Sequence, residues 1–92
     1  MKQKWIGIFI FFNSFLFSDT YYVSTTGTDN STCSQATPCD KIQTAIDLTS
    51  DGDIVRVLGG TYYENILIGT AITLQSDDPL DPAIINGSQP ND

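Results

Sequence analysis

The chain has 92 residues, which is enough for one small domain, and it carries 4 basic against 11 acidic side chains with no His, for a net charge of −7. Lys and Arg make most contacts with phosphate, so this composition excludes a basic surface for nucleic acid or for an anionic membrane. The absence of His also excludes nucleophile pairs that depend on imidazole, and it removes the commonest transition-metal ligand. We therefore expect no cofactor.

Residues 1–18 have the pattern of an export signal. Lys2 and Lys4 precede the apolar run 5–12, and Asn13 and Ser14 interrupt the apolar sequence that follows. A membrane-spanning helix needs about 20 apolar residues, which is longer than this run. We predict a signal peptide over 1–18, with an uncleaved anchor as the alternative, and a secreted or cell-surface location for 19–92. We expect no other membrane contact.

Cys33 and Cys39 are the two cysteines of the chain, and both follow the predicted signal. An exported protein meets an oxidising compartment, so we predict that these residues form a disulfide. Their spacing differs from the Cys-x-x-Cys of redox enzymes. Two thiolates without His also leave a zinc site two ligands short, so we expect no metal here.

The segment after the signal begins with a short predicted strand, residues 20–24, and continues through a polar loop, residues 25–38. Asp40 is a good N-cap for a helix that we predict to run to residue 48. Its apolar positions, Ile42, Ala45 and Ile46, recur at helical spacing and should form one buried stripe. Turn chemistry at residues 50–53 ends this helix.

Every predicted element after the helix is a short strand: 54–58, 65–68, 71–75 and 83–85. The connections between them are too brief to hold crossover helices, and each strand is too short to form a stable hairpin alone. Both constraints are met if the chain coils so that each turn of the coil lies parallel on the previous one. The short strands then stack in register, and their inward aliphatic side chains form columns. Three pairs support such coiling because each is 18 residues apart: Ile54 with Ile72, Ile66 with Ile84, and Gly69 with Gly87.

Several motifs resemble the N-terminal part of right-handed parallel β-helix proteins of the pectin-lyase-like superfamily. They are the segments 38–46, 52–57, 60–66, 72–74 and 84–87, which read PCDKIQTAI, GDIVRV, GTYYENI, ITL and IING. The resemblance covers about residues 20–88, and the same opening resembles that of pectinesterases. It implies a mainly β fold, the start of a right-handed parallel β-helix, or solenoid, with one N-terminal capping α-helix plugging the coil.

The segment around residues 59–65 is predicted to be a structural corner. Gly59 and Gly60 permit a tight bend, and Asn65 can bond exposed backbone groups there. We expect Tyr62 or Tyr63 to lie over the corner with its hydroxyl in water.

Carboxylates are the candidate reactive groups. Glycosidic cleavage needs two carboxyls about 5 to 10 Å apart, one of them with a pKa raised by burial. The candidates lie in turn sequences where solvation keeps them ionised, so we assign no catalytic, cofactor-binding or metal-binding residue; they are Asp51, Asp53, Glu64, Asp77, Asp78 and Asp81. The last three share one loop and are the best candidates for Ca²⁺, although an ordinary solvated loop is the favoured interpretation.

Asn30 and Asn86 begin the tripeptides Asn-Ser-Thr and Asn-Gly-Ser, which are possible N-glycosylation sites in an exported protein. Such tripeptides also occur by chance in polar loops.

The leading hypothesis is an exported, non-catalytic β-helix module of a cell-surface or secreted protein, used for recognition or adhesion and directed at polysaccharides. The alternative is the N-terminal fragment of a pectinesterase or polysaccharide lyase with its active site beyond residue 92. A third interpretation is a free-standing disulfide protein, which would pair strand 71–75 antiparallel to strand 54–58.

A solenoid needs a cap at both ends. We therefore expect an excerpt of a longer protein, an open last coil that pairs with further chain or another molecule, or a chain that folds poorly alone.

Overall fold

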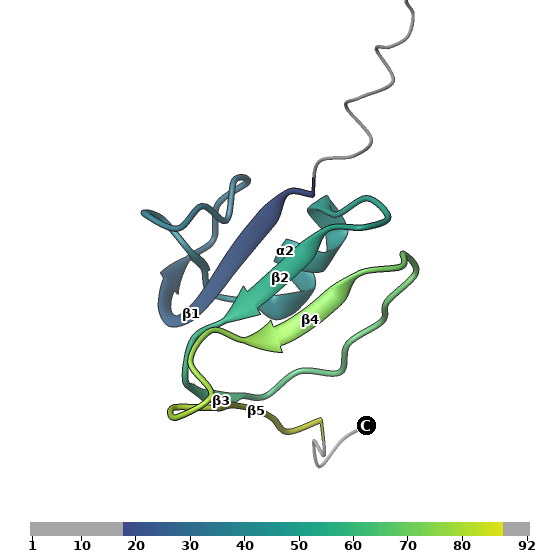
Figure 1. The fold of residues 1–92 in the computed structure, drawn as a ribbon. Coiled ribbons are helices and arrows are strands. Elements are labelled where there is room, and N and C mark those ends of the chain that lie inside the picture. Colours follow the sequence, from purple (N-terminus) through teal and green to yellow (C-terminus); the bar gives the residue numbers. More distant parts are fainter. Residues whose placement is uncertain (1–17, 88–92) are drawn as a thin grey trace, which may run out of the picture.

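The computed structural model describes residues 18–87 (Figure 1). The predicted signal peptide lies outside these residues except for Ser18. In chain order the elements are β1 (Thr20–Thr28), α2 (Ile42–Leu48), β2 (Ile54–Val57), β3 (Gly60–Tyr62), β4 (Thr73–Ser76) and β5 (Ala83–Ile85). The fold is mainly β, as predicted.

Strands β1, β2 and β4 form one parallel sheet in that order. Ile54 of β2 lies between Thr20 of β1 and Thr73 of β4, and the register continues without a break along each pair. Because successive side chains alternate between the two faces of a strand, residues from all three strands align in two inward columns. These columns are Tyr21, Val55 and Leu74, and Val23, Val57 and Ser76.

Strands β3 and β5 form a second parallel sheet, in which Gly60 pairs with Ala83 and Tyr62 with Ile85. Figure 1 shows this sheet beyond the C-terminal ends of β2 and β4, reached from β2 by a sharp bend. Gly60 has a φ of 137°, which residues with a Cβ rarely adopt. The predicted bend at this glycine is confirmed.

Helix α2 packs its apolar stripe against β1 and β2 (Figure 1). Ile42 and Ala45 are fully buried and Ile46 nearly so, as the helical spacing predicted. They join the buried side chains of the sheets and the disulfide in one core, whose other members are Val23, Cys33, Cys39, Val55, Val57 and Tyr62. The core is therefore aliphatic apart from one tyrosine and the cystine.

The prediction of a solenoid is wrong. The chain forms two small parallel sheets, of three and two strands, with one short helix. The 18-residue spacing does not set the register, because Ile54 pairs with Thr73 rather than Ile72, and Ile84 pairs with Thr61 rather than Ile66. The parallel direction of pairing was predicted correctly, and β2 and β4 are not antiparallel as a free-standing disulfide protein would require.

The predicted strand at 65–68 is also absent from the fold. The backbone of Leu67 instead bonds the side chain of Gln43, donating its N–H to Oε1 at 2.9 Å and accepting from Nε2 at 3.0 Å. These bonds attach the segment to α2. Because the N–H and C=O of Leu67 both bond Gln43, they do not pair with a neighbouring strand. Leu67 and Ile68 are exposed, while Ile66 packs partly against the core.

Candidate functional site

The disulfide predicted between Cys33 and Cys39 is present, and both residues are fully buried. The loop that it closes lies along the outer edge of β1, where the Tyr22 N–H donates to the Cys33 carbonyl at 2.7 Å. A Cβ at Gly27 would lie 2.4 Å from the Cys39 carbonyl oxygen, so this strand needs a glycine for the close approach. The disulfide loop therefore covers one edge of the three-stranded sheet.

Asn30 organises the same loop through both atoms of its side-chain amide. Its Oδ1 accepts from the N–H of Cys33 at 2.8 Å and of Thr32 at 2.9 Å. Its Nδ2 lies within 3.2 Å of the carbonyl oxygens of Thr28 and Pro38. The nitrogen that a glycan would modify is thus engaged in holding the loop, and glycosylation of Asn30 and Asn86 stays a prediction.

The N-terminus of α2 is capped from a distance. Asp40 was the predicted N-cap, but the helix begins at Ile42 with Lys41 in the cap position and no capping bond from its side chain. The carboxylate of Glu64 accepts from the N–H groups of Ile42 at 2.8 Å and Gln43 at 3.0 Å. A helix start is stabilised by a negative charge and leaves its first N–H groups unpaired. Glu64 supplies both the negative charge and the hydrogen-bond acceptors. The sequence of the helix itself contains no pattern that predicts this distant cap.

We expect Glu64→Ala to lower the free energy of unfolding by about 1–3 kcal/mol, because two partly buried N–H groups lose their acceptor. Glu64→Gln should cost less, since its amide oxygen still accepts one bond while the charge is lost. Urea unfolding followed by circular dichroism measures both. Asp29→Ala on an exposed loop is the control. Equal costs for Glu64→Ala and Asp29→Ala would show that the cap contributes nothing.

Other candidate carboxylates also bond the backbone or an ion-pair partner. Asp53 is 5% exposed, and its carboxylate accepts from the N–H of Asp19 at 3.0 Å and of Ser50 at 2.8 Å. Asp51 accepts from the N–H of Ala71, and Asp78 from that of Leu80. Asp77 forms an ion pair with Arg56 at 2.9 Å. These interactions give the carboxylates structural roles.

Asp77, Asp78 and Asp81, predicted to share one loop, do line one hollow together with residues of β1 and of the β2–β3 bend. Ser24 in this hollow is nearly buried, but its hydroxyl is bonded to Thr26. Within residues 18–87, no group of three or more His, Cys, Asp or Glu side chains is arranged to hold a metal ion.

A second polar hollow, here called the Tyr63 hollow, lies where β1, β3 and the start of α2 meet. Its volume is about 280 Å³, and Tyr63, which lines it, is 67% exposed. The hollow is lined by hydroxyl, carboxylate, ammonium and aromatic groups from three segments of the chain: Thr25, Asp40, Lys41, Thr61, Tyr62, Tyr63 and Glu64. The sequence pointed to Tyr63 as a corner residue and gave no signal that Asp40 and Lys41 would lie beside it.

Tyr62 contributes to the wall of this hollow from the core. Of the two tyrosines predicted as alternatives for the corner, Tyr62 does not hold its hydroxyl in water, since it is 4% exposed and its hydroxyl donates to the Leu58 carbonyl at 2.7 Å, whereas Tyr63 is 67% exposed. Burial raises the pKa of Tyr62, as do the charges of Glu64 and Asp81, while a hydrogen bond with the Thr25 backbone acts in the opposite direction. The hydroxyl therefore stays protonated at neutral pH and is not a general base.

The Tyr63 hollow combines an exposed aromatic face with both donors and acceptors of hydrogen bonds. That combination suits a ligand with one apolar face and a rim of hydroxyl groups.

No helix among residues 18–87 is long and apolar enough to cross a membrane. The comparisons with protein-family models, with curated proteins and with solved structures found no match.

Proposed function

We propose that this chain is an exported, non-catalytic recognition module that binds glycans through the Tyr63 hollow. The observation that carries the proposal is the exposure of 67% of Tyr63 beside a hollow lined by hydrogen-bonding groups. A side chain this exposed buries little apolar area and so contributes little to the stability of the fold. It is available to pack against a ligand.

The chemistry of the hollow favours a sugar over other small ligands. A pyranose ring has an apolar face of C–H groups, which packs on an aromatic ring, and hydroxyl groups at its rim, which need donors and acceptors. Asp40 and Glu64 supply acceptors, Lys41 supplies donors, and Thr25 and Thr61 supply both. The volume of about 280 Å³ suits one or two sugar rings better than a long chain.

The use of the carboxylates supports recognition rather than catalysis. Glu64 holds the start of α2, and Asp53 holds two backbone N–H groups near β2. A glycosidase needs one carboxyl with a raised pKa facing a second across the sugar. The disulfide supports an exported protein, because such bonds persist in oxidising compartments.

We expect Tyr63→Ala to lower the affinity for a bound oligosaccharide about fivefold, because stacking on the ring contributes about 1 kcal/mol. An array of neutral and uronate oligosaccharides identifies binders, and isothermal titration calorimetry measures the affinity. Leu67→Ala is the control, since Leu67 is 81% exposed and lies outside the hollow. Binding that survives Tyr63→Ala unchanged would contradict the site. Cleavage or de-esterification of the oligosaccharide during the incubation would favour the enzyme alternative instead.

A further inference from the structure

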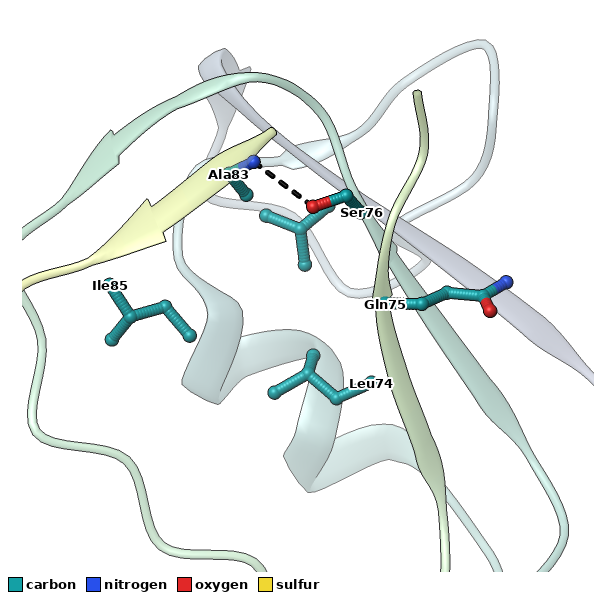
Figure 2. Close-up of a pocket in the computed structure, with 6 residues that line it drawn as sticks. Leu74, Gln75, Ser76, Ala83 and Ile85 are labelled. Atoms are coloured by element: carbon teal, nitrogen blue, oxygen red, sulfur yellow. Dashed lines mark hydrogen bonds between the residues drawn. The ribbon is translucent and has the colours of Figure 1, made fainter. Parts of the chain in front are cut away.

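An apolar groove lies between β4 and β5, on the side of the molecule away from the disulfide loop. Its volume is about 190 Å³, and Val57 forms part of its wall. Figure 2 shows Leu74 of β4 and Ile85 of β5 extending into the same space, while Gln75 projects to the opposite side of its strand. Ile85 is 43% exposed and its neighbour Ile84 is 55% exposed. The groove is therefore an open continuation of the core.

Strand β4 forms one edge of the three-stranded sheet, and no other strand among residues 18–87 pairs with its outer side. The disulfide loop bonds the outer edge of β1, at the other side of the sheet. The N–H groups of Thr73 and Asp77 donate to carbonyls of the β2 segment. Because N–H groups alternate in direction along a strand, those of Leu74 and Ser76 face the uncovered side. They form a template for one more strand.

Strand β5 is held beside this edge in a fixed position. The N–H of Ala83 donates to the Ser76 hydroxyl at 3.1 Å, which ties β5 to β4 (Figure 2), and the N–H of Asn86 donates to the Tyr62 carbonyl at 2.8 Å. An incoming strand would thus meet a prearranged apolar groove as well as backbone donors. Prearrangement lowers the entropic cost of binding.

We propose that the β4 edge and this groove bind an extended aliphatic peptide that carries Lys or Arg, added as a strand. Alternate aliphatic side chains of the peptide enter the groove between Leu74 and Ile85, and its backbone pairs with β4. The site is separate from the Tyr63 hollow, since the two share no lining residue. The proposal therefore holds whether or not the hollow binds a glycan.

Charge and sequence select this occupant. Asp77, Asp78 and Asp81 lie in the turn that joins Ser76 of β4 to Ala83 of β5, two residues that line the groove, and Arg56 forms an ion pair with Asp77. A second copy would bring the same carboxylates, and residues 19–92 carry two cations against eleven acids. A basic aliphatic peptide satisfies both the charge and the apolar surface.

The probe is a blocked peptide of sequence KITITV, titrated into the purified chain by calorimetry. We expect binding that weakens at least tenfold when the peptide is N-methylated at alternate amides, because strand addition needs those N–H groups. The acidic counterpart EITITV should also bind at least tenfold more weakly. Binding of the N-methylated peptide at the affinity of the parent would overturn strand addition.

Two variants of the protein locate the site. Ile85→Lys should reduce peptide affinity at least tenfold, and the half-exposed position of Ile85 allows the lysine to reach water while the fold is retained. Leu67→Lys, outside the groove, should leave affinity unchanged, and circular dichroism checks both folds. Equal losses for the two variants would overturn the assignment. So would sedimentation showing a dimer that Ile85→Lys dissociates, because the groove would then be occupied by a second copy.

Discussion

Replacing both cysteines, Cys33→Ala with Cys39→Ala, is expected to lower the free energy of unfolding by about 2–5 kcal/mol. Closing even a short loop restricts the unfolded chain, and the two residues are fully buried members of the core. Their loop also supplies bonds along the edge of β1, so its loosening would expose that strand. The loss should appear in urea unfolding curves of the variant, and equally when the wild-type chain is unfolded under reducing conditions.

A matched control for this variant is Gln35→Ala, which changes an exposed residue inside the same loop. It should alter stability by no more than about 0.5 kcal/mol. A double-alanine variant as stable as the control would show that the disulfide is dispensable to the fold.

Ile42→Ala should cost about 2–5 kcal/mol, the range for truncating a fully buried aliphatic side chain. Ile42 is 0% exposed and belongs to the stripe with which α2 covers β1 and β2. Its N–H also binds the Glu64 carboxylate, but that bond involves only the backbone and survives the substitution. The cost should therefore come from the cavity left beneath the helix.

Leu80→Ala is the counterpart for Ile42→Ala, because Leu80 is 92% exposed and should contribute less than about 0.5 kcal/mol. Thermal unfolding measured by calorimetry gives both values. A cost for Ile42→Ala within the range of Leu80→Ala would mean that α2 does not pack on the sheet in solution.

Features that depend on local spacing were predictable from the sequence. The apolar stripe Ile42, Ala45 and Ile46 was identified from helical periodicity, and the strand at 83–85 has the predicted bounds. Val55 and Val57, which occupy alternate positions of the predicted strand 54–58, are both buried. The disulfide was predictable because the chain has two cysteines, both after a predicted export signal, so each has the other as its partner.

Features that depend on distant partners were not predictable. Glu64 caps a helix that begins 22 positions earlier, and Gln43 holds the backbone of Leu67. These side chain to backbone bonds replaced the strand that the apolar pattern of 65–68 indicated. Equal spacing of isoleucines likewise indicated a regular coil, whereas the register depends on how the whole segments pack.

The candidate site was partly visible in the sequence. Tyr62 and Tyr63 are adjacent and look alike, yet one is buried with its hydroxyl bonded to Leu58 and the other is 67% exposed. Alternation alone indicates that neighbours in a strand face opposite ways but not which of them faces the core. Asp40 and Lys41 joined the Tyr63 hollow through the tertiary packing of α2, to which a single sequence gives no access.

The order β1, β2, β4 has a consequence for the path by which the chain acquires its structure. Each parallel pairing joins segments separated by a long stretch of chain, so the contact order is high. The chain must lose the conformational entropy of loop closure before these native contacts stabilise it. Folding should then take milliseconds to seconds, as in other proteins dominated by non-local pairing. Because the first amides of α2 bind Glu64, the helix should be completed only when the chain beyond β3 has docked.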